Sequence, residues 1–210
     1  MAVITISRQF GAGGRSLGEM IARELDYRFL DDLVIQELAK KAKVTTDTIK
    51  DIERTSGSVL SKMISGMLNR NYMERILGEG KGYVNEEIYV ELIQDVLKNF
   101  AREGNVVLLG RGGQYILKDF ENAFHILLVS DMEQRIKFMQ QFYSMTDAQA
   151  EKAIKQGDDR RRNLYKKLGH TDYNSPNLYH IVLNMSRLSL DHALETIVAL
   201  VLKSEKPEKR

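Results

Sequence analysis

The sequence contains no cysteine among its 210 residues. This absence excludes disulfide bonds, thiolate metal sites and cysteine nucleophiles. No apolar run approaches the roughly 20 residues that a membrane-spanning helix needs. The N-terminal segment also lacks the basic and apolar regions of a signal peptide. We therefore expect a cytoplasmic protein that does not bind a membrane.

An excess of one charge is also missing, because 31 Lys and Arg face 29 Asp and Glu, which leaves a net charge of +2. This balance indicates no general attraction to nucleic acid. The length suits one well-cored domain and is short for two. We expect a single domain over residues 1–202 and a charged, disordered tail over residues 203–210.

Five short apolar segments are predicted to be strands, and most are continuous rather than alternating. Such runs are typical of parallel strands that helices cover on both faces. Helical patterns lie between them, so the order of elements predicts a three-layer α/β fold with a five-stranded parallel sheet. The predicted strands cover residues 3–6, 27–30, 106–109, 125–129 and 181–183.

The core of this fold would consist of residues 1–31 and 104–202, with a helical insertion over about residues 32–103. The insertion contains several helical patterns and no convincing strand. Its glycine-rich segment, Gly78–Gly82, suits a flexible turn between helices better than the hinge of a moving lid.

The first predicted strand leads into a glycine-rich turn and a helix, within residues 3–18 (VITISRQFGAGGRSLG). The pattern G-x-x-x-x-G-K-[ST] of a phosphate-binding loop would place glycine at 9 and lysine at 15, where this chain has Gln9 and Arg15. Glycines at the start of a helix let backbone N–H groups approach an anion, and a guanidinium grips phosphate oxygens with two donors. We predict that ATP phosphates bind at Gly11, Ala12, Gly13, Gly14, Arg15 and Ser16.

In this prediction Arg15 takes the catalytic place of the lysine, and the Ser16 hydroxyl holds magnesium. The alternative is a glycine-rich turn with a surface arginine. The order of strand, loop and helix favours the phosphate site.

A second candidate region is basic. Thr146–Gln149 fits a capping box that starts a helix, and this helix runs into the segment 158–167 (DDRRRNLYKK). Such a run alone is usually a solvated helix face. Beside a phosphate loop it suits a lid, over about residues 157–175, whose arginines stabilise the charge of a phosphoryl group in transfer.

Three separated motifs resemble the cytidylate kinase-like family of P-loop kinases. They lie in residues 4–15 (ITISRQFGAGGR), 106–114 (VVLLGRGGQ) and 177–184 (NLYHIVLN). The resemblance implies a P-loop kinase fold with a helical substrate-binding insertion and an arginine-rich lid. It also implies transfer of the γ-phosphoryl group of ATP to an acceptor phosphate, with magnesium.

The resemblance further implies roles for single residues. Arg160 and Arg162 match two catalytic lid arginines, while Arg111 and Asp31 match residues that bind the substrate. The chain departs from cytidylate kinases at Gly112, Arg161 and Asn184, where those enzymes carry aspartates. Since two of these aspartates serve cytosine recognition, we expect weak selection of cytosine.

Three further expectations concern single side chains. Asp31 and Asp32 would face opposite sides of a strand, so that only one enters the pocket while the other caps a helix. Asp131 is a better N-cap than a residue near magnesium. The four histidines show no metal-ligand spacing and are predicted to be structural.

The sequence thus predicts an ATP- and magnesium-dependent kinase of a nucleoside monophosphate or another small phosphorylated acceptor. The alternative is a nucleotide-binding regulatory module that has the kinase fold but no turnover. We expect a small-molecule partner and no nucleic acid, because one short basic run is a weak electrostatic footprint. A homo-oligomer stays open.

Overall fold

Five parallel strands form one sheet at the centre of the structure, a computed structural model that describes residues 1–54 and 84–204. Their order in the sheet is β2-β3-β1-β4-β5, which places β1 in the middle. The five predicted strands are confirmed. They are β1 (Val3–Arg8), β2 (Arg28–Leu30), β3 (Val106–Leu109), β4 (Ala123–Val129) and β5 (Ile181–Asn184).

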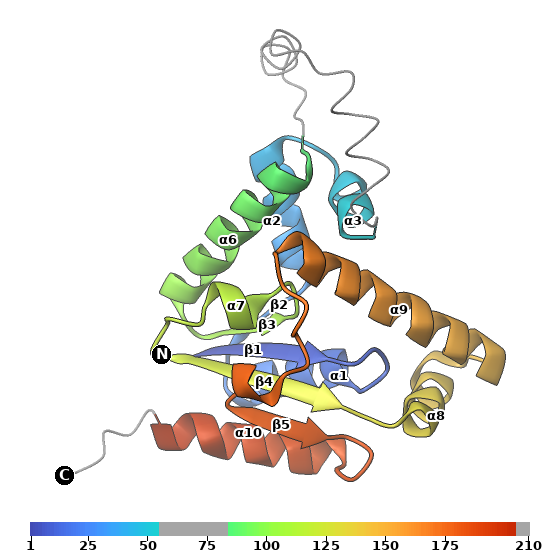
Figure 1. The fold of residues 1–210 in the computed structure, drawn as a ribbon. Coiled ribbons are helices and arrows are strands. Elements are labelled where there is room, and N and C mark those ends of the chain that lie inside the picture. The colour runs from blue at the N-terminus through green and yellow to red at the C-terminus, as the bar shows by residue number, and fades with distance from the viewer. Residues whose placement is uncertain (55–83, 205–210) are drawn as a thin grey trace, which may run out of the picture.

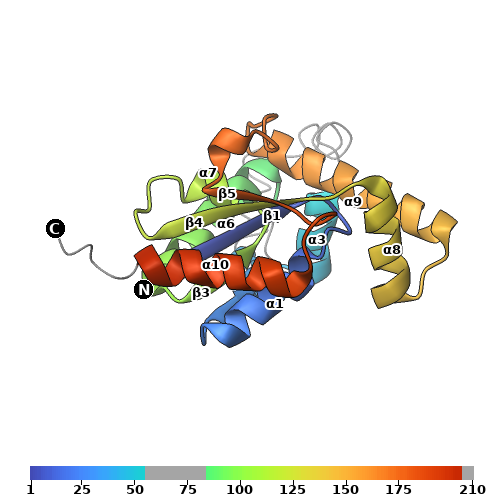
Figure 2. The same ribbon diagram turned by 90° about the horizontal axis from the view of Figure 1, so that it is seen from below.

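Helices cover both faces of this sheet. Figure 2 shows α1 and α10 lying along one face, and Figure 1 shows α2, α3 and α6 on the opposite side. The predicted three-layer α/β architecture is therefore confirmed. The helices are α1 (Gly14–Glu24), α2 (Asp32–Ala42), α3 (Thr46–Arg54), α6 (Glu86–Glu103), α7 (Gly113–Ile116), α8 (Met132–Tyr143), α9 (Asp147–Lys167) and α10 (Leu190–Ser204), with a 3-10 turn at Pro176–Leu178.

The two faces of the sheet bury two separate hydrophobic clusters. Val106 and Leu108 of β3 pack with residues of α2 and α6, whereas Val107 and Leu109 of the same strand pack with residues of α1 and α10. Successive side chains of a strand point to opposite faces, so both sets must be apolar. This is why the strand sequences are continuous apolar runs.

Parallel strands end on one common edge of the sheet, and the glycine-rich turn, α8 and α9 gather there (Figure 1). The predicted capping box of α9 is confirmed, because Thr146 Oγ1 accepts from the Gln149 N–H and Gln149 Oε1 accepts from the Thr146 N–H. Asp131 occupies the N-cap position of α8 as expected, although its side chain makes no capping hydrogen bond.

The predicted insertion contributes α2, α3 and α6 to the described part of the chain. Gly78–Gly82 lies outside the described residues. At the other end of the chain, α10 continues through Ser204, so Lys203 and Ser204 belong to the helix and not to the expected tail. None of the helices in the described ranges is long and apolar enough to cross a membrane.

Candidate active site

The glycine loop, residues 9–13, connects the carboxyl end of β1 to the start of α1. Gly11 and Gly13 have φ angles of 82° and 79°, in the left-handed region that glycine adopts without strain. Gly13 is the N-cap of α1, yet no side chain caps this helix and its first turn carries no acidic residue. The first N–H groups of α1 therefore lack a protein side-chain acceptor, an arrangement that suits an anion.

Gln9 explains why the expected first glycine of the loop is missing. Its backbone N–H donates to the Leu128 carbonyl at 2.9 Å, and its side-chain Oε1 accepts from the Ser130 N–H at 2.7 Å. Both bonds hold the loop against the end of β4. Only a side chain can make the second bond, so a glycine at this position would lose it.

Asp158 of α9 fixes the other side of the glycine loop. Its Oδ1 accepts from the Phe10 N–H at 2.9 Å, and its Oδ2 accepts from Arg135 Nη1 of α8 at 2.7 Å. The Phe10 ring lies directly against Gly157, where an added Cβ would stand 2.3 Å from the ring. The helix that carries the predicted lid is thus joined to the loop by a charge-assisted hydrogen bond and by close packing.

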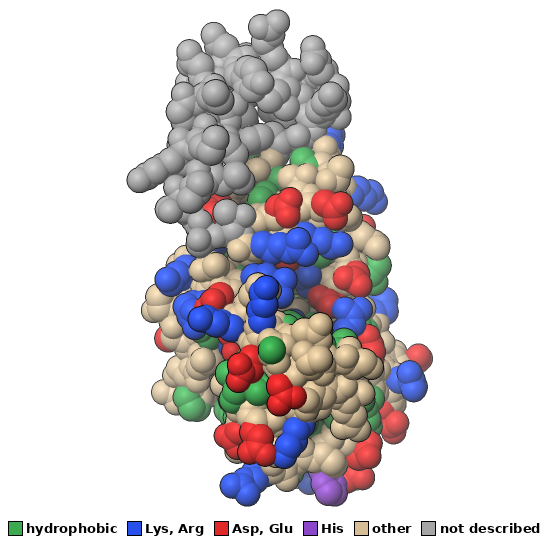
Figure 3. Space-filling view, turned by 90° about the vertical axis from the view of Figure 1, so that its right-hand side faces the viewer, with side chains coloured by type: hydrophobic (Ala, Val, Ile, Leu, Met, Phe, Trp, Pro, Cys, Tyr) green, Lys and Arg blue, Asp and Glu red, His purple; other side chains and the backbone are tan. Residues whose placement is uncertain are grey.

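A cavity of about 300 Å³ lies beside the glycine loop, and we call it the cationic pocket. Figure 3 looks onto this edge of the sheet and shows Lys and Arg side chains gathered in a band around a hollow. The charged residues among its described lining are the cations Arg8, Lys50, Arg54, Arg111, Arg160 and Arg161 and the carboxylates Asp31 and Glu53.

Both of these carboxylates bind Arg111. Its Nη1 donates to Asp31 Oδ1 at 2.8 Å and its Nε donates to Glu53 Oε1 at 3.0 Å, while the Tyr89 hydroxyl donates to the same Glu53 oxygen at 2.9 Å. Burial alone would lower the pKa of Arg111, but Glu53 and Asp31 outweigh it and raise that pKa. The sequence-predicted pair, Arg111 and Asp31, is therefore brought together in one buried network.

The backbone around Arg111 is unusual. Gly110, Arg111 and Gly112 have successive φ angles of 74°, 53° and 75°. A positive φ is costly for arginine and tends to persist where function requires it. The turn directs the Arg111 side chain from the end of β3 into the pocket.

Arg15 lies outside the cationic pocket, with 46% of its side chain exposed. It donates to Asp31 Oδ2 at 2.8 Å, to Asp32 Oδ2 at 3.3 Å and to Glu19 Oε1 at 3.1 Å. Burial opposes its charge, but the bonds to Asp32 and Asp31 raise its pKa overall. The described lining of the pocket contains Asp31 and not Asp32, as expected. The two side chains do not face apart, however, because Asp31 is the N-cap and Asp32 the first residue of α2, and both bind Arg15.

Arg8 is a pocket residue that the sequence reasoning missed. Its side chain runs between Gly14 and Gly110. A Cβ added at Gly14 would lie 2.8 Å from Arg8 Cγ, and a Cβ added at Gly110 would clash with Arg8 Nη1. Burial lowers its pKa; Asp31 and Tyr165 raise it, and Arg111 and Arg161 lower it further. A signal existed in the sequence, since an arginine that ends a buried central strand must point into the carboxyl edge of the sheet.

The three consecutive arginines of α9 face different directions. Arg160 and Arg161 line the cationic pocket, whereas Arg162 bonds Asp159 at 2.6 Å, half exposed, and is absent from the described lining. Hydrogen bonds to Tyr173 and Asp159 raise the pKa of Arg162. Residues two apart on a helix differ by about 200° around its axis, so Arg160 and Arg162 cannot share a face.

The aspartate positions of cytidylate kinases are used differently here. Gly112 packs so closely on Leu168 that an added Cβ would lie 2.3 Å from Leu168 Cδ1. Asn184 ends β5, and its side-chain oxygen accepts from the Ser186 N–H at 3.0 Å. Neither position offers a carboxylate to a ligand in the cationic pocket.

A second hollow, of about 440 Å³, also borders the glycine loop and shares no lining residue with the cationic pocket. Gly11–Gly13 form one wall, and polar and apolar side chains of α8 and of the segment after β5 form the others. Those apolar residues include Phe138, Phe142, Met185, Leu188 and Leu190. The glycine loop therefore borders two cavities of different character.

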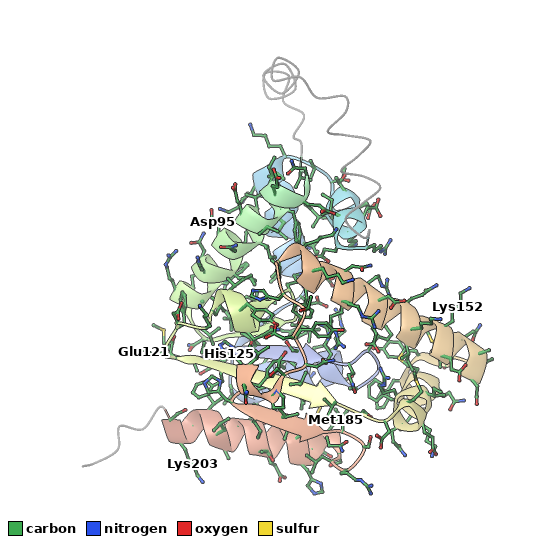
Figure 4. All side chains as sticks on the ribbon, in the orientation of Figure 1. Asp95, Glu121, His125, Lys152, Met185 and Lys203 are labelled. Atoms are coloured by element: carbon green, nitrogen blue, oxygen red, sulfur yellow. The ribbon has the colours of Figure 1, made fainter. Side chains whose placement is uncertain are left out.

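No group of three or more metal-ligating His, Asp or Glu side chains occurs within residues 1–54 and 84–204. Ser16 lies in the first turn of α1, partly exposed. His125, labelled in Figure 4 within the sheet, has its Nδ1 2.8 Å from Thr5 Oγ1. Burial and the nearby His180 lower its pKa to about 4, so it is a neutral structural group at pH 7.

Comparison with known proteins identifies the family and the fold. The model of the family described as "Cytidylate kinase-like family" matches residues 3–187. No curated protein matches the chain. Among solved structures, an uncharacterized protein from Eubacterium ventriosum ATCC 27560 is 15% identical, with a TM-score of 0.67, and the match covers 96% of this chain and 98% of that one.

Shikimate kinase from Bacteroides thetaiotaomicron is also 15% identical, with a TM-score of 0.50 and the same two coverages. At such identities the structural matches establish the fold alone.

Proposed function

Because the chain belongs to the cytidylate kinase-like family and has a P-loop kinase fold, we propose that it is an ATP-dependent kinase. In this proposal it transfers a phosphoryl group to a nucleoside monophosphate or another small phosphorylated acceptor.

The observation that carries the proposal is the position of the glycine loop between two cavities. One is the cationic pocket, and the other is the hollow in which Phe138, Phe142 and Met185 lie beside uncharged polar side chains such as Gln134 and Gln141. A phosphoryl transfer needs a donor and an acceptor that bind next to one phosphate-binding element, with the acceptor oxygen close to the transferred phosphorus and in line with the leaving oxygen. An aromatic and aliphatic hollow suits the base of the donor nucleotide, and a cationic one suits the acceptor.

The loop fits the phosphates of ATP. Its left-handed glycines and the uncapped start of α1 supply backbone N–H donors, and we assign this role to residues 11–16. The Ser16 hydroxyl would hold magnesium, which binds few protein ligands and keeps several waters. When bound, magnesium neutralises phosphate charge.

The cationic pocket fits an anionic acceptor. Arg111 keeps donors beyond the two that Asp31 and Glu53 occupy, and the carboxylates fix its position. Arg160 lies at the mouth of the same pocket and would stabilise charge on the phosphoryl group in transfer. We assign a catalytic role to Arg15 and Arg162 as well, which requires both to leave their present carboxylate partners.

The acceptor base is predicted to be weakly selected. Gly112 and Asn184 offer no carboxylate, and a site that cannot accept a hydrogen bond from the cytosine amine loses selectivity. CMP should therefore be a poor substrate, and the preference for cytosine over uracil should be small.

A phosphate-transfer assay with ATP and magnesium tests the proposal. The acceptors are nucleoside and deoxynucleoside monophosphates and other small phosphorylated molecules. Ser16→Ala should reduce turnover by at least about tenfold, since it removes a magnesium ligand. Lys152→Ala is the control, because Lys152 points away from the molecule on the outer side of α9 (Figure 4).

Three results distinguish the alternatives. Transfer that depends on Ser16 supports the kinase. Binding of ATP in calorimetry with no transfer to any acceptor would instead favour a nucleotide-binding regulatory module. Failure to bind ATP would contradict both.

A further inference from the structure

We propose that the acceptor carries a second anionic group, a phosphate or a carboxylate, and that Arg8 and Arg161 bind it. This inference rests on the proposed function and narrows its substrate class. A singly phosphorylated acceptor would satisfy the Arg111 side of the pocket and leave donors of Arg8 and Arg161 without an acceptor.

Arg161 provides the first observation. Its side chain is 11% exposed, and its Nε and Nη1 are buried with no hydrogen-bond partner in the described structure. Only Nη2 has a contact, at 3.4 Å from Asp158 Oδ1, and that oxygen already accepts from the Phe10 N–H. Buried donors of a charged group are costly to leave unsatisfied, so they indicate an acceptor that arrives with a ligand.

The Arg161 guanidinium is also held in place. Its carbon lies 5.2 Å from the centre of the Tyr173 ring, and the side chain lines the cationic pocket. Stacking on an aromatic ring orients the planar donors while leaving them free for a ligand. Arg161 is therefore preorganised toward the pocket.

Arg8 provides the second observation. The glycines at 14 and 110 leave the room in which its side chain lies, so the fold accommodates this arginine specifically. No ion pair within 4 Å joins Arg8 to a carboxylate of the described residues. Asp31 acts on Arg8 favourably from farther away, but Asp31 already binds Arg111 and Arg15, and the like charges of Arg111 and Arg161 oppose it. A half-buried guanidinium that has no ion-pair partner of its own gains stability when an anion binds beside it.

The charges of the pocket support a second anion. Asp31 and Glu53 are the acidic residues in its described lining, and Arg111 binds both, at 2.8 Å and 3.0 Å. A phosphate monoester carries about −1.5 to −2 near pH 7. One such group cannot balance Arg8, Arg161 and the remaining charge around Arg111 and Arg160 together.

Calorimetric titration without ATP tests this inference, with two matched probes, adenosine 5′-monophosphate and adenosine 3′,5′-bisphosphate. Two or more charge-assisted hydrogen bonds should make the bisphosphate bind at least about tenfold more tightly. Arg161→Gln should remove most of this gain and change monophosphate affinity by less than about twofold. Lys152→Gln removes the same charge from the exposed side of α9 and should preserve both affinities.

Arg161→Lys replaces the glutamine variant in this test if the latter fails to fold, as judged by circular dichroism. Lysine keeps the positive charge but lacks the planar guanidinium, so this variant should retain part of the tighter bisphosphate binding. Equal affinities of the wild-type protein for the two probes would overturn the inference, as would an equal loss of both in Arg161→Gln.

The binding test of the second anion site and the transfer assay of the kinase can give different results, so the two proposals are tested separately. Turnover of monophosphates with no advantage for bisphosphates leaves the kinase intact and removes the second anion site. An Arg161-dependent gain in binding without any turnover supports the anion site and contradicts the kinase.

Discussion

Gly112 shows at the scale of one residue how this chain differs from cytidylate kinases. Its φ of 75° lies in the left-handed region, and an added Cβ would stand 2.3 Å from Leu168 Cδ1. A side chain there meets both backbone strain and a packed leucine. An aspartate for base recognition could be added at this position only with a strained backbone and a displaced Leu168 side chain.

We therefore predict that Gly112→Ala lowers the free energy of unfolding by about 2–3 kcal/mol, from strain and overpacking together. Gly169→Ala is the matched control, because Gly169 has a φ of 81° but nothing within 4 Å of an added Cβ. It should cost only the strain, about 1 kcal/mol. Urea denaturation followed by circular dichroism measures both. Equal losses in the two variants would show that Leu168 does not restrict position 112.

Single arginines were the least predictable part of the site. The sequence places three consecutive arginines at 160–162 without saying which of them faces the pocket. The facing residue is fixed by the packing of Gly157 on Phe10 and by the bond from Phe10 to Asp158, contacts that join segments far apart in the sequence. Arg111, by contrast, could be placed from its motif, because the end of a parallel strand fixes its location.

At the scale of elements, the docking of α9 on the glycine loop depends on Asp158. This carboxylate joins Phe10, Arg135 and Arg161, and 21% of its side chain is exposed. Asp159 beside it bonds Arg162 at 2.6 Å, but both partners are about half exposed. Of the two neighbouring aspartates, Asp158 therefore forms a largely buried ion pair and Asp159 a solvated one.

We predict that Asp158→Ala lowers the free energy of unfolding by about 2–4 kcal/mol, since it leaves Arg135 and the Phe10 N–H without their acceptor. Asp159→Ala should cost less than about 1 kcal/mol, as exposed pairs do. Asp158→Asn keeps an acceptor oxygen and should fall between them. Thermal and urea unfolding of the three variants provide the measurement, and a loss in Asp159→Ala as large as in Asp158→Ala would refute this account of the docking.

Elements were predicted better than their contacts. The strands follow from continuous apolar runs, and the start of α9 from the spacing of Thr146 and Gln149, because these signals are local. The directions of Asp31 and Asp32 were misjudged for the opposite reason. The predicted strand ends at residue 30 as β2 does, but both side chains bind Arg15 of α1, and such a contact between separate elements leaves no local pattern.

At the scale of the whole molecule, one sheet separates two hydrophobic clusters. Leu108 and Leu109 are adjacent in β3, yet Leu108 packs with α6 and its neighbours while Leu109 packs with α1 and α10. Each is almost fully buried. The three-layer order was predictable because it needs only the sequence of elements, whereas the assignment of helices to faces required the structure.

Because both clusters share the same strands, we predict that a destabilising substitution on one face of the sheet lowers the stability of the helices on the other face. Leu109→Ala should lower the free energy of unfolding by about 2–5 kcal/mol, as expected when a buried leucine is truncated. Hydrogen exchange followed by mass spectrometry should then show protection falling in α6 as much as in α10, although α6 lies across the sheet from residue 109. Leu108→Ala is the mirror variant and should lower protection in α10 equally. If each substitution affected only the helices of its own face, the layers would unfold separately, and the sheet would not couple them into one cooperative unit.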